Sequence, residues 1–260
     1  KKLKAIAVDR GKKRLSLHNR KQLLELSHWF LDENKKKSMP SDTYNWGTLQ
    51  GLTNQEKGGT LPIKNYMTNI WDISPEDLEG FSAEYIRGVF DPDPNPCWAC
   101  QMHHCHMMKI TEGPYEGEVV EEPEYEGFAA WGPVTGQTDV ASTMMVSNEV
   151  DKLGLETNEC GWLMGLVMEC YEKGMINIED TDMLEMTWGN AETTRAMLRK
   201  IANRDGFGDL LAEGTMRAAK AIGGEAPSLA IHTMKGNSPR GHDHRSHWQE
   251  MFDTCVSNTG

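Results

Sequence analysis

The sequence predicts a mostly α-helical protein, and three observations carry that prediction. Apolar residues recur at helical spacing in several windows of the chain, and recognisable start and stop residues flank those windows. Only the first eleven residues, KKLKAIAVDRG, have the β-branched and apolar character of a strand. Since nothing nearby could pair with that strand, we expect it to be the end of another domain.

The helices are predicted from periodicity and capping residues. Residues 20–36 carry a broad apolar face, and Ser74 followed by Pro75 and two acids is a strong helix start. Asn190 and Thr157 are expected to cap two later helices, and Gly174 and Gly223 to end two. The predicted helices span residues 20–36, 74–89, 138–153, 157–173, 190–202 and 207–222.

Two segments are predicted to lack regular helices. Residues 37–73 are rich in Gly, Asn, Thr and Pro, and we expect irregular structure there. The run DPDPNP at 91–96 should break the chain before a long loop or ribbon over residues 97–133, because proline blocks helical continuation. From residue 235 onward the chain is polar.

Composition and charge exclude several classes of function. The net charge is −12, which argues against nucleic-acid binding because phosphate neutralisation needs a basic surface. The longest apolar run, residues 160–170, is far shorter than a membrane span requires, so we expect no membrane partner. The six cysteines, three of them clustered, do not resemble a secreted disulfide framework, so we predict a cytoplasmic protein.

The clustered cysteines predict a metal site. Cys97 and Cys100 have the CxxC spacing that lets two thiolates bind one metal or cluster from a tight turn, and Cys105 follows. One alternative is zinc bound by these residues together with neighbouring histidines at positions 103, 104 and 106. Another is an iron–sulfur cluster with a fourth cysteine from elsewhere. The third is that the cysteines are simply buried and free. Cys160 and Cys170 lie in an apolar helical window and are expected in the core. Cys255 is expected to be structural.

Five further segments decide between zinc and an iron–sulfur cluster. Together with the cysteine run, their order and spacing resemble the tungsten-containing aldehyde ferredoxin oxidoreductase family. The PEYE motif lies within residues 121–139 and the DxxGL motif within 148–174. The start of the chain resembles the KGLKAI strand that closes the N-terminal β domain of the family. The remaining matching segments are GGTLPIKNY at 58–66, the cysteine run, and KGNSPRGHDHR at 235–245.

The resemblance implies an activity and cofactors. Family members hold tungsten, or sometimes molybdenum, between the dithiolenes of two pterins, and they oxidise aldehydes to carboxylic acids. A [4Fe–4S] cluster passes the electrons to ferredoxin or another carrier, and a homodimer is possible. One relative instead reduces the aromatic ring of benzoyl-coenzyme A. The implied fold is an N-terminal β domain followed by two helical domains. We therefore expect domain segments at 1–11, 12–234 and 235–260.

The resemblance also implies roles for individual residues. Glu126 matches the glutamate beside the metal and is the expected catalytic acid or base, with Glu124 as the alternative. Asp151, Gly154 and Leu155 match the motif that contacts the pterin. The polar segment from Lys235 to Arg245, with Arg240, His242, Asp243 and His244, would contact pterin phosphate or substrate. The ordinary alternatives are an acidic surface loop, a helix end at Gly154 and a solvated polar loop.

The chain departs from the family pattern in two ways. The family's third cysteine falls at His104, one position before Cys105, and we expect Cys105 to be the ligand because thiolate is the usual cluster ligand. The fourth cysteine and a catalytic histidine would lie beyond residue 260, so we expect these residues alone to be incomplete for catalysis. A zinc-stapled helical binding module and a cluster-only electron-transfer subunit of the same family are the competing hypotheses.

Overall fold

The computed structural model describes residues 6–9, 11–12 and 15–256, and the chain divides into two compact units, Lys1–Ser41 and Asp42–Gly260. The first unit contains α1 (Arg20–Lys35), which the sequence predicted. Asn19 caps it by accepting a hydrogen bond from the Gln22 N–H. None of its residues is buried, and Trp29 and Phe30 on its apolar face are at least half exposed. Residues 6–9 and 11 have no strand structure, contrary to the prediction; the rest of that predicted strand lies outside the described residues.

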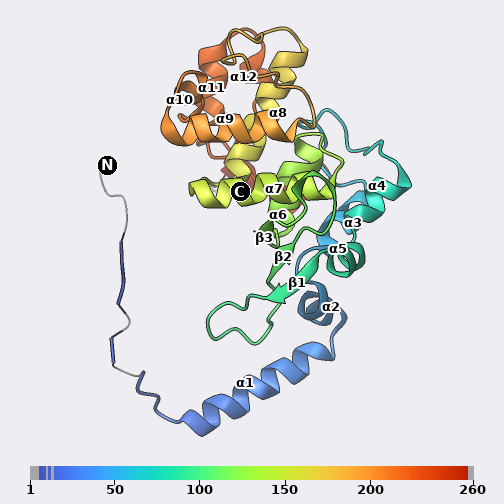
Figure 1. The fold of residues 1–260 in the computed structure, drawn as a ribbon, viewed down its shortest axis with the longest axis vertical. Helices are drawn as coiled ribbons and strands as arrows, with labels where there is room; N and C mark the ends of the chain where they lie inside the picture. The colour runs from blue at the N-terminus through green and yellow to red at the C-terminus, as the bar shows by residue number, and fades with distance from the viewer. Residues whose placement is uncertain (1–5, 10, 13–14, 257–260) are drawn as a thin grey trace. The chain divides into compact units, whose positions relative to one another are not determined.

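The second unit is mainly helical, which confirms the predicted fold class (Figure 1). Helix α2 (Ser38–Trp46) leads into it. A three-stranded antiparallel sheet, in the order β1-β2-β3, lies among the helices. Its strands are β1 (Asp91–Pro94), β2 (His106–Lys109) and β3 (Val119–Glu121). The helices are α3 (Gln50–Lys57), α4 (Pro75–Gly80), α5 (Ala83–Val89), α6 (Tyr125–Ala129), α7 (Val140–Leu153), α8 (Thr157–Glu172), α9 (Ala191–Asn203), α10 (Phe207–Leu211), α11 (Thr215–Ile222), α12 (Ala226–Leu229) and α13 (Trp248–Val256). A 3₁₀ turn spans Gly113–Tyr115, and a π-helical segment, η2, spans Ala130–Val134.

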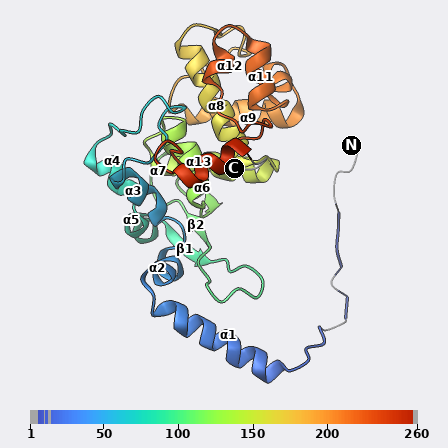
Figure 2. The ribbon, with the colours of Figure 1, turned by 180° about the vertical axis from the view of Figure 1, so that it is seen from behind.

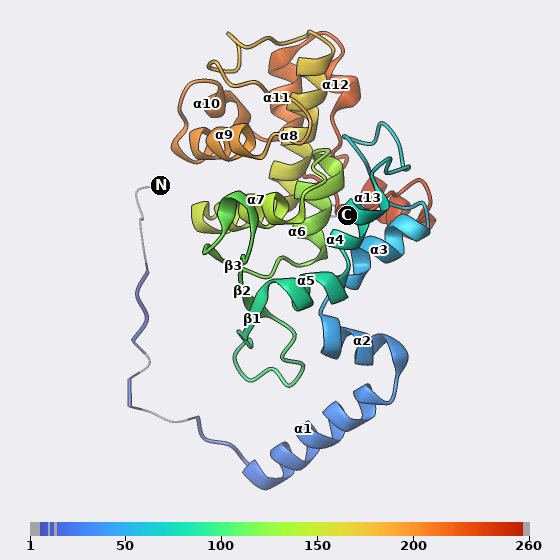
Figure 3. The same cartoon turned by 45° about the vertical axis from the view of Figure 1, so that its right-hand side comes forward.

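Two apolar cores meet at α7. One core gathers α8 to α12 around Leu163, Leu166 and Val167, and α7 contributes Val146 and Val150 to it. The other core packs α3, α5, the sheet and α6 against the opposite side of α7, at Met144 and Met145. Figure 3 shows α7 between the group formed by α8 to α12 and the sheet. Because α7 is buried on both sides, its end is held firmly beside the start of α8.

Several predicted elements require correction. Residues 37–73 contain α2 and α3, and α3 is anchored by the buried Leu52, so the prediction of irregular structure was wrong for these two helices. Residues 58–73 contain neither a helix nor a strand, as predicted. The predicted helix 74–89 is two helices, because Ser82 accepts a hydrogen bond from the Tyr85 N–H and starts a second one. The predicted helix 207–222 is also divided, at Gly214.

The proline-rich run was expected to prevent regular structure, yet it forms β1. Pro92 pairs with Met108 and Pro94 with His106 in an antiparallel register. Proline is compatible with this position because β1 lies at the edge of the sheet, where one side of the strand has no ladder to donate to. The predicted loop over 97–133 also ends earlier than expected, because α6 begins at Tyr125 and η2 follows it at Ala130.

Within the described part of the chain, none of the helices combines the length and the apolar composition that crossing a membrane requires. Cys160 and Cys170 are buried in the helical core, as predicted, whereas Cys255 is exposed.

Candidate functional site

The cysteine run forms the loop that joins β1 to β2. Its base is closed by the Asn95 N–H, which donates to the Cys105 carbonyl at 2.9 Å. Within it, the Cys100 N–H donates to the Cys97 carbonyl at 3.1 Å, which gives the tight turn expected of a CxxC motif. The Cys97 and Cys105 side chains contact each other. The loop therefore brings at least two of the three predicted ligands together.

The environment of Cys105 disfavours a free thiolate. Burial and, with a smaller effect, the nearby Glu124 carboxylate raise the pKa of this thiol to about 12. His104 Nδ1, Cys105 Sγ and a Glu124 carboxylate oxygen all lie within 4.8 Å of one another. Nitrogen, sulfur and oxygen donors at this spacing form a set that suits a metal ion. Both candidates for the third ligand, His104 and Cys105, face this point, so the choice between them stays a prediction.

A buried ion-pair cluster supports the cysteine loop from below. Glu122 accepts hydrogen bonds from Arg87 Nη2 at 2.7 Å and from His106 Nδ1 at 2.8 Å. Arg87 also donates to the carbonyls of His104 at 2.7 Å and Asn45 at 2.6 Å. The arginine therefore ties the C-terminal end of the loop to the helical body. No local sequence pattern predicts this cluster, because its members come from four separate segments.

The two glutamates of the PEYE motif stand at the start of α6. Glu124 accepts a hydrogen bond from the Thr48 hydroxyl, which in turn accepts from the Tyr125 N–H at 2.8 Å. Glu126 accepts from the Gly241 N–H at 3.0 Å, and its other carboxylate oxygen lies 3.9 Å from His242 Nε2. Both carboxylates are thus held in fixed orientations by groups from distant parts of the sequence.

One cavity of about 390 Å³ unites four of the ten predicted site residues. Cys105 lines it from the loop, Glu124 and Glu126 from α6, and Asp151 from the end of α7. Its complete lining is Cys105, Glu121, Glu122, Pro123, Glu124, Glu126, Gly127, Ser147, Asp151, Glu156, Thr157 and Asn158. The cysteine, PEYE and DxxGL motifs therefore open onto the same space.

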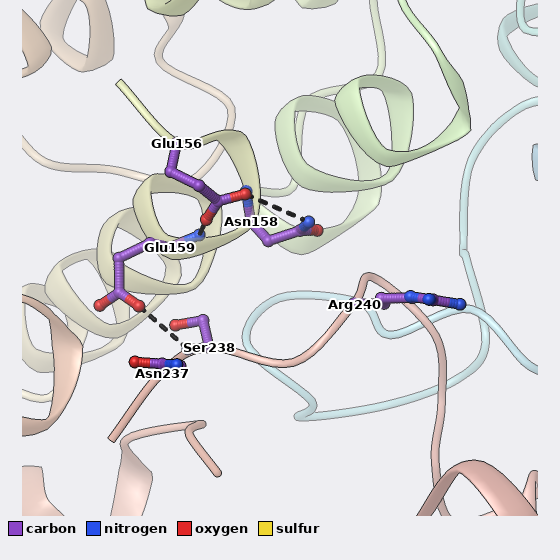
Figure 4. Close-up of a pocket in the computed structure, with 6 residues that line it drawn as sticks. All are labelled: Glu156, Asn158, Glu159, Asn237, Ser238 and Arg240. Atoms are coloured by element: carbon purple, nitrogen blue, oxygen red, sulfur yellow. Dashed lines mark hydrogen bonds between the residues drawn. The ribbon is translucent and has the colours of Figure 1, made fainter. Parts of the chain in front are cut away.

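A second cavity of about 450 Å³ adjoins the first, because Glu156 and Asn158 line both (Figure 4). Figure 4 shows Glu156 reaching back over the first turn of α8, where it accepts from the N–H groups of Asn158 at 3.1 Å and Glu159 at 2.6 Å. Glu156 is thus the cap of α8, and the predicted cap Thr157 is its first residue. The buried Oδ1 atom of Asn158 has no hydrogen-bond partner.

The DxxGL motif lies where α7 ends. Asp151 is in the last turn of α7, and Gly154 and Leu155 follow that helix. Desolvation raises the pKa of the Asp151 carboxyl. Gly154 has φ +66° and its N–H donates to the Asp151 carbonyl at 3.1 Å, so it ends α7 as a left-handed cap. Leu155 packs against the helical core. The glycine therefore has a sufficient structural reason for its identity, and contact of these residues with a pterin stays a prediction.

The segment 235–245 reaches the second cavity, and its contact with a cofactor stays a prediction. Lys235 and Arg245 are absent from the linings of both cavities. Arg245 instead forms two hydrogen bonds to the buried Asp243, at 2.9 and 2.6 Å. Arg240 lines the second cavity, together with Asn237 and Ser238. Arg240, a member of the predicted polar segment, is therefore placed to meet an anionic group there.

A left-handed turn at residues 64–66 connects the segment 235–245 to the helical core. Lys64, Asn65 and Tyr66 have φ values of +46°, +53° and +68°, an uncommon conformation for residues with side chains. The turn stacks the Tyr66 ring on Trp162, with centroids 4.9 Å apart. Trp162 Nε1 donates to the Pro239 carbonyl at 2.8 Å. Sequence reasoning missed this support, as well as Glu156 and Asn158, because no local pattern marks them.

Comparisons with known proteins support the same family as the sequence motifs. The chain is 31% identical over 248 residues to the tungsten-containing aldehyde ferredoxin oxidoreductase of Pyrococcus furiosus, an alignment that covers 93% of this chain and 39% of that protein. It is 28% identical over 206 residues to the WOR-like subunit of an aliphatic sulfonate oxidoreductase from the same organism, with coverage of 77% and 32%. The chain thus spans about two fifths of the length of the curated relatives it matches.

Among solved structures, the chain resembles the active-site complex BamBC of benzoyl-coenzyme A reductase, solved with 1,5-dienoyl-CoA. The TM-score is 0.68 at 20% identity, over 85% of this chain and 33% of that one, which shows a shared fold. The model of a family described as aldehyde ferredoxin oxidoreductase, domains 2 and 3, matches residues 25–260. With the match covering nearly the whole chain, this protein belongs to the aldehyde ferredoxin oxidoreductase family.

Proposed function

We propose that this chain is the central part of a tungsten- or molybdenum-pterin oxidoreductase that oxidises an aldehyde to a carboxylic acid and passes the electrons to ferredoxin. The observation that carries the proposal is the single cavity onto which Cys105, Glu126 and Asp151 open. In a redox enzyme of this class, an electron-transfer ligand, a proton-transfer group and a cofactor contact must lie within one site. The family and the names of the relatives support the chemistry.

The residues present fit the implied cofactors. Cys97, Cys100 and Cys105 offer thiolates for an iron–sulfur cluster from one loop, and a fourth ligand would come from outside these residues. The unpartnered Asn158 Oδ1 is an acceptor suited to the amine and ring N–H groups of a pterin, and Asp151 lies beside it in the same lining. Arg240, at the second cavity, suits a pterin phosphate. When bound, the metal–pterin group supplies the two-electron redox chemistry.

The role of Glu126 follows from its surroundings. The Gly241 N–H orients its carboxylate, and His242 Nε2 lies 3.9 Å from the other oxygen. A carboxylate held in this way can accept a proton released as an aldehyde is oxidised. Glu124 is engaged by Thr48, which leaves Glu126 the stronger candidate.

The test is Glu126→Gln in the complete protein. Glutamine keeps an acceptor for the Gly241 N–H, so folding, iron and pterin content should be preserved. Loss of a positioned general acid or base should lower kcat by roughly 10²–10⁴-fold. Glu118→Gln is the matched control, because Glu118 belongs to the same acidic stretch but is exposed and away from the cavity. Equal, mild effects of the two substitutions would end the catalytic assignment.

The metal assignment has its own test. Cys105→Ser in the complete protein should lower the iron content sharply, whereas His104→Ala should leave it nearly unchanged. The opposite pattern would make His104 the ligand.

A zinc-stapled binding module remains the second candidate, because His104, Cys105 and Glu124 converge as zinc ligands could. About four iron atoms per chain support the oxidoreductase, and one zinc with sulfur ligation supports the binding module. A cluster-only subunit would bind iron but no pterin.

Other features of the proposal extend the family resemblance. The domain segments 1–11, 12–234 and 235–260, a homodimer and a cytoplasmic location stay predictions. The substrate class is also open to the chemistry of the relatives, since one is named for an aliphatic sulfonate and another for an acyl-coenzyme A. Assays of the complete protein against an aldehyde, an alkyl sulfonate and an aromatic acyl-coenzyme A would separate these classes.

A further inference from the structure

Three histidines of the segment before α13 surround one carboxylate. Glu250 lies 2.8 Å from His242 Nδ1, 3.8 Å from His244 Nε2 and 3.9 Å from His247 Nδ1. The His242 and His247 rings stack, with centroids 5.9 Å apart. Figure 2 shows α13, which carries Glu250, on the side of the second unit that faces away in Figure 1. Only the His242 contact is a hydrogen bond, so two imidazoles approach the carboxylate without bonding to it.

His244 is the informative member of the cluster. It is 7% exposed, and its Nδ1 atom lies 2.9 Å from the Tyr66 hydroxyl, which also accepts from the His244 N–H at 3.0 Å. Its other ring nitrogen, Nε2, is buried and has no hydrogen-bond partner. A buried nitrogen without a hydrogen-bond partner is unfavourable. One nitrogen fixed by a hydrogen bond and the other free is the arrangement of a metal-ligating histidine.

We propose that His242, His244, His247 and Glu250 form a structural binding site for a divalent transition-metal ion such as zinc. Imidazole and carboxylate donors suit this class of ion. Tetrahedral zinc with bonds of about 2.1 Å places its ligand atoms about 3.4 Å apart. The three distances from Glu250 to the histidine nitrogens, 2.8, 3.8 and 3.9 Å, lie on both sides of that separation.

Binding requires a small rearrangement of the side chains. Among the described residues, only His104, Cys105 and Glu124 form a group of this kind in which one ligand atom from each residue lies within 4.8 Å of the others, so the histidine nitrogens must move closer together. His247 is the most exposed of the three and can rotate, whereas the bond to Tyr66 holds His244 in place. The ion would thus assemble around His244 and satisfy its unpartnered nitrogen.

The site would anchor the start of α13 to the candidate active site. His242 lies between the two, with Nδ1 toward Glu250 and Nε2 3.9 Å from Glu126. Metal binding through Nδ1 requires the neutral ring to carry its proton on Nε2, directed toward Glu126. The inference is independent of the proposed oxidoreductase function, because it concerns zinc and not the pterin or the cysteine loop.

The experiment uses the complete protein, depleted of loosely bound metal with a chelator and then titrated with zinc alone. Zinc bound per chain is measured by elemental analysis, and its ligands by X-ray absorption at the zinc edge, which iron and tungsten do not obscure. We expect one zinc per chain with a nitrogen and oxygen shell at about 2.0–2.1 Å and no sulfur at about 2.3 Å.

The variants His247→Ala and Glu250→Gln should each weaken zinc binding at least tenfold in competition with a chelator. Glutamine keeps an acceptor for His242, and His247 is partly exposed, so both variants should fold, which a thermal melt verifies. Gln249→Ala on α13 and His28→Ala on α1 are the controls and should bind zinc as the parent does. No zinc uptake, a sulfur shell, or unchanged affinity in both variants would each overturn the proposal.

Discussion

Replacing Glu122 by glutamine is expected to destabilise the base of the cysteine loop. The Glu122 side chain is only 5% exposed, and its two partners, Arg87 and His106, are nearly as well buried. Glutamine has almost the same shape but only one acceptor oxygen, which can bond Arg87, while its amide group faces His106 Nδ1 and bonds it only when that nitrogen carries no proton. The substitution therefore removes charge without leaving a cavity. This makes Glu122 unsuitable as a silent control for Glu126, although both lie in one acidic stretch.

The magnitude follows from the two hydrogen bonds that lose charge assistance. Bonds to charged groups contribute about 1.5–3 kcal/mol and neutral ones about 0.5–1.5 kcal/mol, so each bond should lose about 1–1.5 kcal/mol. Two bonds, at 2.7 and 2.8 Å, give a loss of about 2–3 kcal/mol in the free energy of unfolding. For a chain of this size, that loss lowers Tm by about 4–12 °C.

The assay is calorimetric unfolding of the complete protein, together with its iron content. Arg87→Gln and the double variant complete a mutant cycle, in which the two changes should be strongly non-additive because the residues bond each other. Iron should be lost faster from Glu122→Gln during dialysis, since Arg87 also bonds the His104 carbonyl in the loop. A Tm within 1 °C of the parent, or additive effects in the cycle, would refute the reasoning.

Two other substitutions test the packing and the electrostatics. Gly161→Ala should lower the free energy of unfolding by about 1–3 kcal/mol, because the new Cβ would lie 2.6 Å from the Ala130 Cβ. Gly88→Ala is the control: it lies within α5 with open space around the new Cβ, so it should be neutral or stabilising. Glu149→Gln should destabilise the protein at pH 7, because the hydrogen bond from Arg199 lowers the pKa of Glu149 below its usual 4.5. A group whose pKa is lower in the folded state stabilises the protein at pH values above its unfolded pKa. The difference in Tm between Glu149→Gln and the parent should therefore be full at neutral pH and shrink as pH falls below 4.5. A difference in Tm that stays constant across that range would contradict the assignment.

Local signals in the sequence predicted the elements whose stability is decided locally. Asn190 and Ser74 cap helices because each side chain accepts from an N–H three residues ahead, a relation contained within one turn. Helix α1 formed where the periodicity predicted it. The CxxC turn likewise depends only on its own residues. Local rules failed at Ser82, where a second good cap restarted the helix within a window of uniform periodicity.

The candidate site was predictable only in part. The motifs indicated Cys105, Glu126 and Asp151, and the fold brings all three to one cavity. Arg245 was predicted to contact the cofactor, which stays a prediction, and in the folded chain the buried Asp243 accepts its hydrogen bonds. An arginine binds the nearest buried carboxylate because an uncompensated buried charge is very unfavourable, and sequence alone does not show which carboxylate is buried.

The sequence by itself determined the helical class, the capped helices, the cysteine turn and the family to which the chain belongs. Tertiary structure decided which side chains share a space. The DPDPNP run can form a strand because that strand lies at the edge of the sheet, with β2 as its single neighbour. Glu122 meets Arg87, Glu126 meets Gly241, and His244 meets Tyr66 across separations of 35, 115 and 178 residues. Local propensity acts over a few residues, whereas these contacts form only when the two cores close on α7, and so only the folded chain fixes them.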